Sequence, residues 1–113
     1  TEIMTAKVDP APGSPEWDVR QLPAGFVLTD FRRRRLHKDV AAEHMVFTDG
    51  MATVSVYIER TRSGIDAFKG PSNMGAMNAY GTVVDGYQVT VVGEVPPATV
   101  KMIATSVRRQ ASS

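Results

Sequence analysis

The chain has 113 residues, of which 42% are apolar and 22% are charged, and its formal net charge is +1. This length suits a single domain that buries a substantial core. A charge so close to zero provides no overall field for a nucleic acid, and the sequence contains no nucleic-acid-binding motif. Cysteine is absent, which excludes zinc–thiolate sites and cysteine nucleophiles.

The first segment, residues 1–16, contains several prolines and little apolar patterning. Such a composition is typical of a flexible linker. We therefore expect a linker over residues 1–16 and a folded domain over residues 17–113. No signal-peptide pattern opens the sequence, and no apolar run approaches the roughly 18 residues of a membrane span, so we do not expect the chain to cross a membrane.

The first strong structural signal is the dipeptide Asp49-Gly50. It suits a two-residue type I′ turn, because both turn residues must take positive φ. Counting outward from that turn places Met45 opposite Val54 and gathers the apolar side chains on one face. The strands expected before and around the turn cover residues 26–37, 41–48 and 51–60.

A second hairpin is expected around the dipeptide Asp85-Gly86. Counting outward places Val84 opposite Tyr87 and again produces one apolar face. A long loop is expected to precede this hairpin. The loop covers residues 61–75, and the two strands cover residues 76–84 and 87–95.

After the second hairpin the apolar residues change to a helical spacing of i, i+3, i+4 and i+7, which predicts a helix over residues 97–109. The expected fold class is therefore α+β. It consists of an antiparallel sheet of about five strands, with the C-terminal helix packed on one face. The expected core comprises Phe47, Val54, Val56, Tyr80, Val89, Val91, Ile103 and Val107.

The densest charge run is Arg32, Arg33, Arg34 and Arg35, with Lys38 close behind. On a strand, these arginines alternate between the two faces. Because unpaired buried charges are very costly, we expect this part of the strand to be exposed on both sides, either at an edge of the sheet or beyond its covered area. One interpretation is protection against edge-to-edge aggregation. The other is a surface that binds an acidic partner.

Other polar residues form no recognisable chemical site. The two histidines, His37 and His44, lack the spacing of a metal site. The expected register places His44 opposite Ser55, but no nucleophile-elbow motif surrounds this pair. Glycines in the 61–75 segment do not match a phosphate-binding loop. We therefore expect no metal, no cofactor and no catalytic residue, and a protein that is not an enzyme.

Three segments together carry a family resemblance. The first, from Trp17 to Phe26, has the pattern Trp-x-x-x-x-Leu-Pro-x-Gly-Phe. The second is the hairpin segment 49–59, and the third includes Gly-Glu-Val-Pro within residues 89–100. In this order they resemble the C-terminal domain of the MucB/RseB family, over roughly residues 16–108. Members of that family are periplasmic negative regulators of the sigma-E, or alginate-type, envelope-stress pathway.

The resemblance implies a binding module. In that family, the full protein binds the periplasmic part of a membrane-spanning anti-sigma factor of the MucA/RseA type and shields it from regulated proteolysis. A larger N-terminal domain is linked to lipid or lipopolysaccharide signals, so this chain would be the second domain alone. We expect Arg32, Arg33, Arg34, Arg35 and Lys38 to contact the partner.

Two alternatives remain open. One is a lipid- or lipopolysaccharide-binding module of the cell envelope, in which the arginines contact phosphate and the loop with Met74 and Met77 contacts acyl chains. The other is an enzyme of unrecognised type. Nucleic acid is not an expected partner.

Overall fold

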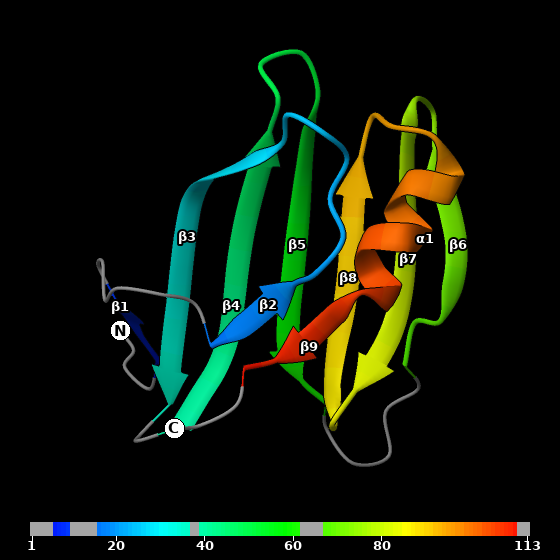
Figure 1. Cartoon of the computed structure of the whole chain (residues 1–113). Coiled ribbons are helices and arrows are strands. Elements are labelled where there is room, and N and C mark those ends of the chain that lie inside the picture. Colours follow the sequence, from blue (N-terminus) through cyan, green and yellow to red (C-terminus); the bar gives the residue numbers. More distant parts are fainter. Residues whose placement is uncertain (1–5, 10–15, 37–38, 62–66, 111–113) are drawn as a thin grey trace.

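The computed structural model of the chain describes residues 6–9, 16–36, 39–61 and 67–110. It contains one helix and two antiparallel sheets within these residues (Figure 1). The elements are β1 (Ala6–Asp9), β2 (Trp17–Val19), β3 (Val27–Leu36), β4 (Asp39–Thr48), β5 (Thr53–Arg60), β6 (Gly70–Met74), β7 (Met77–Val84), β8 (Tyr87–Gly93), α1 (Pro97–Thr105) and β9 (Val107–Arg109).

The larger sheet has seven strands in the order β1-β3-β4-β5-β8-β7-β6, and β2 pairs with β9 in a small second sheet. The α+β class is therefore confirmed, but the estimate of about five strands was too low. The strands that were missed have three to five residues each, which is too short for an alternating pattern to show. In addition, β6 begins with Gly70-Pro71 and lies inside the segment that was expected to be a loop.

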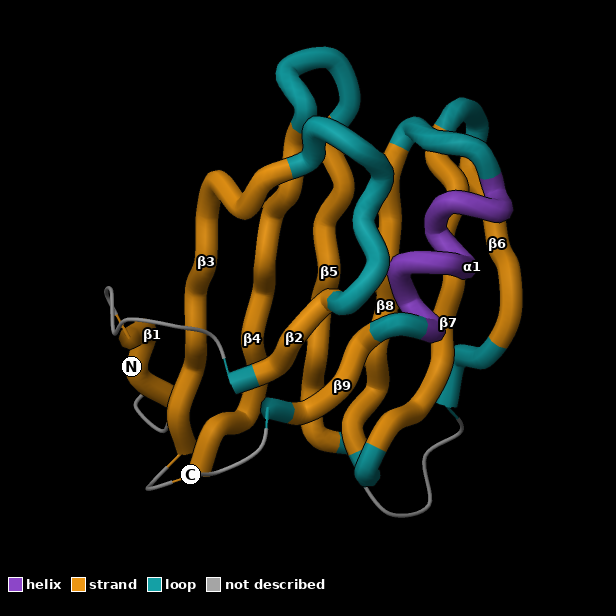
Figure 2. Tube along the Cα trace, in the orientation of Figure 1, coloured by secondary structure: helices purple, strands orange, loops and turns teal. Residues whose placement is uncertain are grey.

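The core lies on one face of the large sheet, under α1, β2 and β9 (Figures 1 and 2). We call this the covered face and the opposite one the open face. Seven of the eight expected core residues are buried, and Tyr80 is half-buried and packs against them. The cluster also includes residues outside those eight: Trp17, Met45, Ile58, Tyr87, Val100 and Ala104.

The second hairpin has the expected register. Val84 pairs with Tyr87, and both turn residues have positive φ, 51° at Asp85 and 80° at Gly86. These values are those of a type I′ turn, which matches the twist of the flanking strands. The prediction from the dipeptide is therefore confirmed.

The first hairpin differs from its expected register. Met45 pairs with Val56 rather than Val54, so the loop has four residues instead of two. The reason lies in the Asp49 side chain, whose Oδ1 accepts the N–H groups of Met51 at 2.9 Å and Ala52 at 2.8 Å. The backbone N–H bonds of the loop lower the pKa of this carboxyl. Because the shift is two residues, every side chain keeps its expected face.

The helix is also shorter than expected, because α1 ends at Thr105 rather than at residue 109. The Ser106 hydroxyl donates to the Ile103 carbonyl at 2.8 Å, and the following residues form β9 against β2. Val107 is buried, but it contributes to the core from a strand rather than from the helix. In the part of the chain that the structure describes, no helix has the length and apolar character needed to span a membrane.

The N-terminal segment lies only partly within the described residues. Ala6–Asp9 forms β1, which runs antiparallel to the end of β3. Residues 1–5 and 10–15 lie outside the described part. The linker over residues 1–16 and the domain boundary at residue 17 therefore stay predictions.

Candidate binding face

Strand β3 divides the arginine run between the two faces of the sheet. Arg32 and Arg34 are exposed on the open face, whereas Arg33 is buried on the covered face, with 3% exposure. The expectation that the run is exposed on both sides was therefore wrong for Arg33. The structure describes only the backbone of Arg35, and Lys38 lies outside the described residues. Contact of all five residues with a partner stays a prediction.

Arg33 is buried because its charge is paired. Its Nε donates to Glu43 Oε2 at 3.2 Å, and both side chains are almost fully shielded from solvent. The same carboxylate oxygen accepts the backbone N–H of Glu16 at 2.8 Å. Burial raises the pKa of Glu43 despite these contacts. The pair therefore fastens the chain just before β2 to the middle of the large sheet, and it is a structural element rather than a binding surface.

The expected free edge of β3 is also partly occupied. Strand β1 pairs with residues Arg33–Leu36, so the backbone there already has a partner strand. The interpretation of this stretch as an unpaired edge was wrong. Addition of a partner segment beside the arginines by β-augmentation would require β1 to leave.

On the open face, the exposed arginines form surface ion pairs. Arg32 lies 3.4 Å from Asp30, and Arg34 lies 3.5 Å from Glu59, with at least half of each side chain exposed. Surface pairs of this kind contribute little to stability, so a partner's carboxylates can exchange with them. The groups surround a hollow of about 260 Å³, which we call the basic hollow. Its lining comprises Arg32, Arg34, Ala42, Glu43, His44, Tyr57 and Glu59.

His44 lies opposite Tyr57, not opposite Ser55 as the first register predicted. The two rings stack with centroids 4.2 Å apart and planes 9° apart. His44 Nε2 is buried and has no hydrogen-bond partner among the described residues. Burial therefore lowers the pKa of His44 and favours the neutral ring. The expected histidine–serine contact, and any nucleophile built on it, is absent from the described residues.

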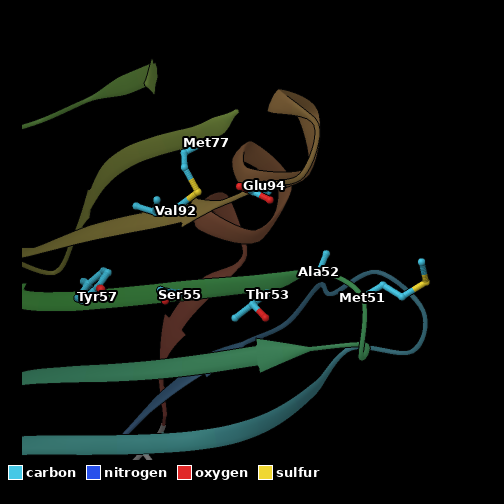
Figure 3. A pocket seen from close by; sticks show the side chains of 8 residues that line it. All are labelled: Met51, Ala52, Thr53, Ser55, Tyr57, Met77, Val92 and Glu94. Atoms are coloured by element: carbon cyan, nitrogen blue, oxygen red, sulfur yellow. The ribbon is translucent and has the colours of Figure 1, made fainter. Parts of the chain in front are cut away.

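A second hollow of about 380 Å³ lies further along the open face, and we call it the apolar hollow. In Figure 3, Met77 on β7 and Val92 on β8 lie side by side near Glu94, and the side chains of β5 form the opposite wall. The sequence analysis named Met77 as a contact for acyl chains in the lipid alternative, but it did not predict the residues of β5 and β8 that complete this hollow. The lining comprises Met51, Ala52, Thr53, Ser55, Tyr57, Met77, Val92 and Glu94.

One part of the open face is covered by the chain itself. Phe68 packs so closely on Gly81 that a Cβ atom at that position would lie 2.3 Å from the Phe68 ring. Gln88 holds this segment through both of its amide atoms, which bond the Phe68 N–H at 3.0 Å and the Phe68 carbonyl at 2.8 Å. The 61–75 segment thus does place an apolar residue on the sheet, but that residue is Phe68 and not the exposed Met74.

A metal centre has no basis in the residues that the structure describes, because they contain no group of three His, Asp or Glu side chains that could hold an ion. His37 lies outside them. What the open face offers is two hollows with charged and apolar walls. Such a surface on a small sheet defines a binding domain.

The comparison with known proteins gives this domain its family. The family described as the MucB/RseB C-terminal domain matches residues 11–108. The chain therefore belongs to the MucB/RseB C-terminal domain family, which consists of regulatory binding proteins rather than enzymes.

Two relatives show how much of a longer protein this chain represents. It is 33% identical over 101 residues to the sigma-E factor regulatory protein RseB of Salmonella typhimurium, covering 87% of this chain and 30% of that protein. It is 35% identical over 102 residues to the sigma factor AlgU regulatory protein MucB of Pseudomonas aeruginosa, covering 86% and 32%. The chain thus spans about a third of the length of these relatives.

Solved structures of related proteins share the fold. One is MucB in complex with MucA(peri), with a TM-score of 0.70 and 31% identity over 88% of this chain and 39% of that one. Another is the Pseudomonas aeruginosa MucA/MucB complex, with a TM-score of 0.71 and 33% identity over 88% and 37%. In both structures, the similar protein is bound to MucA.

Proposed function

We propose that this domain binds the periplasmic region of a membrane-spanning anti-sigma factor of the MucA/RseA type. It acts in the periplasm as part of a negative regulator of a sigma-E-type factor. By holding its partner, it protects the anti-sigma factor from regulated proteolysis and so keeps the sigma factor inhibited. The finding that carries the proposal is the similarity to MucB structures that contain MucA.

The open face supports this proposal. Arg32 and Arg34 project from the same side of β3 and, among the described residues, form exposed ion pairs with Asp30 and Glu59. The planar guanidinium group binds a carboxylate through two parallel hydrogen bonds, so such a surface selects acidic side chains. Of the five residues in the basic segment, these two are the ones whose side chains the structure describes as exposed.

The test is binding of the purified chain to the periplasmic region of a MucA-type anti-sigma factor at low and high salt. In the double variant Arg32→Glu/Arg34→Glu, we expect affinity to fall about tenfold or more and the salt dependence to flatten, because exposed charge contacts are screened by ions. A matched control is Arg20→Glu/Lys101→Glu. It changes the net charge equally at exposed residues outside both hollows.

Equal affinities of the two double variants at both salt concentrations would remove the arginines from the interface. Retention of the unchanged chain on anionic liposomes, without binding to the anti-sigma region, would favour the lipid-binding alternative instead. Protection is measured separately, as the half-life of the anti-sigma region under protease digestion with and without the domain. An unchanged half-life would contradict the protective role.

A further inference from the structure

The two hollows of the open face are parts of one surface. Tyr57 lines both of them, so the basic hollow and the apolar hollow meet at the middle of β5. Together their walls come from β3, β4, β5, β8 and β7, which are consecutive neighbours in the sheet. We call this surface the cross-strand band. It crosses the strands diagonally, because its basic end is level with Tyr57 of β5 and its far end is level with Thr53.

The chemistry of the band changes from one end to the other. At β3, the side chains of Arg32 and Arg34 make it basic. Its middle and far parts combine apolar side chains, with Tyr57 41% exposed and Met77 37% exposed, and the hydroxyl groups of Thr53 and Ser55. The charged residue at the far end is Glu94, which is exposed. An occupant that complements all three parts carries carboxylates, then apolar side chains, then a cation.

The length of the band fixes the size of the occupant. Neighbouring strands lie about 4.8 Å apart, so the four intervals from β3 to β7 span about 19 Å across the sheet. The band is also offset along the strands by the residues between Tyr57 and Thr53, about 13 Å, so its diagonal length is about 23 Å. A helix of about 16 residues covers that distance at 1.5 Å per residue, and an extended segment covers it with about seven residues. Both are within the range of peptide segments that bind domain surfaces.

We propose that the cross-strand band binds an amphipathic segment of the anti-sigma factor, with its acidic end over Arg32 and Arg34, its apolar side chains in the hollow of Met77 and Val92, and a cation at Glu94. This assignment rests on the proposed function and adds to it the location, the polarity and the direction of the bound segment. The segment lies across the strands, so its binding leaves the β1–β3 pairing intact.

Charge complementarity favours a peptide over a lipid. A phosphate headgroup fits the arginine end, but Glu59 and Glu94 also line the band and repel a polyanionic surface. A peptide with both signs of charge satisfies both ends. The apolar contacts with Tyr57 and Met77 are equally available to a peptide and to a lipid. The carboxylates of Glu59 and Glu94 therefore account for the preference for a peptide.

The first test compares two methionines of the β6–β7 hairpin. Met77 lines the apolar hollow, whereas Met74, its neighbour in register, is 78% exposed and does not line it. In binding to the periplasmic region of a MucA-type anti-sigma factor, Met77→Glu is expected to lower affinity at least tenfold and Met74→Glu less than threefold. Thermal melting of both variants checks that they fold.

The outcomes of this test distinguish failure of the cross-strand band from failure of the proposed function. Equal affinities of both variants and the unchanged chain would overturn the cross-strand band while leaving the proposed function intact. Equal weakening by both variants would also overturn it, because the hairpin tip and not the hollow would then be responsible. Failure of the unchanged chain to bind at all would overturn the proposed function itself.

A second test reads the direction of the segment from the sites of cross-linking rather than from changes in affinity. The chain has no cysteine, so a single introduced thiol carries a photo-cross-linker at one defined place. From Glu59→Cys, cross-links are expected at acidic partner residues. From Met77→Cys, they are expected at apolar residues beside a cation in the same segment. Lys101→Cys, outside both hollows, is the control. Cross-links from positions 59 and 77 to unconnected partner segments, or equal yield from position 101, would overturn the proposal.

Discussion

Arg33 and Arg34 are neighbours on one strand, yet they occupy opposite environments. The Arg33 side chain is 4% exposed and is paired with a fully buried Glu43 carboxylate. The Arg34 side chain is 52% exposed, and its partner Glu59 is 59% exposed. The face of the sheet, not the residue type, decides whether an arginine supports the fold or is available to a partner.

The physical difference between the two pairs is desolvation. A buried ion pair is tolerated when charge and hydrogen-bonding capacity are both matched, and here the Glu16 N–H and the Arg33 guanidinium share one oxygen of Glu43. The other oxygen, Oε1, has no partner among the described residues. An exposed pair keeps its water and gains little from pairing, so it costs little to replace.

The largest effect is therefore expected from breaking the buried pair. Glu43→Ala removes the buried carboxylate that pairs with Arg33 and is expected to lower the free energy of unfolding by about 3–5 kcal/mol. Arg34→Ala, on the open face, is expected to change it by about 1 kcal/mol or less. Chemical denaturation of both variants measures the difference.

A double variant shows whether the cost comes from the buried charge of Arg33. Arg33→Met/Glu43→Leu removes both charges and keeps most of the volume, so its stability is expected to return toward that of the unchanged protein. If Glu43→Ala and Arg34→Ala lowered the free energy of unfolding equally, the inferred difference between buried and exposed ion pairs would be contradicted.

The second largest loss of unfolding free energy is expected from truncating an apolar residue, and it should differ between the two faces. Ile103 is a fully buried residue of α1 within the core, and Ile103→Ala is expected to cost about 2–5 kcal/mol through the cavity it leaves. Val92 is half-buried on the open face, and Val92→Ala is expected to cost clearly less because water replaces the lost methyl groups. An unchanged denaturation midpoint for Ile103→Ala would show that α1 does not pack on the sheet as described.

The sequence predicted the faces of the main strands better than their registers. Alternation of apolar residues assigned Met45, Phe47, Val54 and Val56 to one side, and a register shift of two residues left that assignment intact. The turn prediction held at Asp85 and failed at Asp49. The same dipeptide closes a loop of different length when the aspartate side chain accepts the loop N–H groups.

The buried pair could not be predicted in the same way. Arg33 and Glu43 are opposite each other only in the β3–β4 register, which includes two irregular positions. The sequence between these strands contains no turn signal from which to count.

The short strands β2 and β9 were missed for a similar reason. Three residues are too few to show an alternating pattern, and the pairing of β2 with β9 joins segments about 90 residues apart. The basic side of the open face was partly predicted from the arginines, whereas the apolar hollow depends on strand neighbours far apart in sequence.

The smallest expected effect concerns pH and the stacked ring of His44 on the open face. Burial lowers the pKa of His44 in the folded state below its ordinary value of about 6.5. The unfolded chain therefore binds a proton at a higher pH than the folded chain does. Stability associated with neutral His44 is present above about pH 6.5 and is lost as the pH falls from there toward the folded-state pKa.

His44→Phe isolates this effect, because phenylalanine can stack on Tyr57 but does not titrate. Glu43 has a raised pKa and contributes with the opposite sign, since its stability contribution is lost as the pH rises from its ordinary range near 4.5 toward its folded-state pKa. That contribution is common to both proteins and cancels in their difference. The denaturation midpoints of the unchanged protein and of His44→Phe should therefore differ more and more as the pH falls from 8 to 5, because the variant loses less stability. Parallel pH profiles of the two proteins would show that the His44 ring is as well hydrated in the folded chain as in the unfolded chain. That result would contradict a partly desolvated basic hollow.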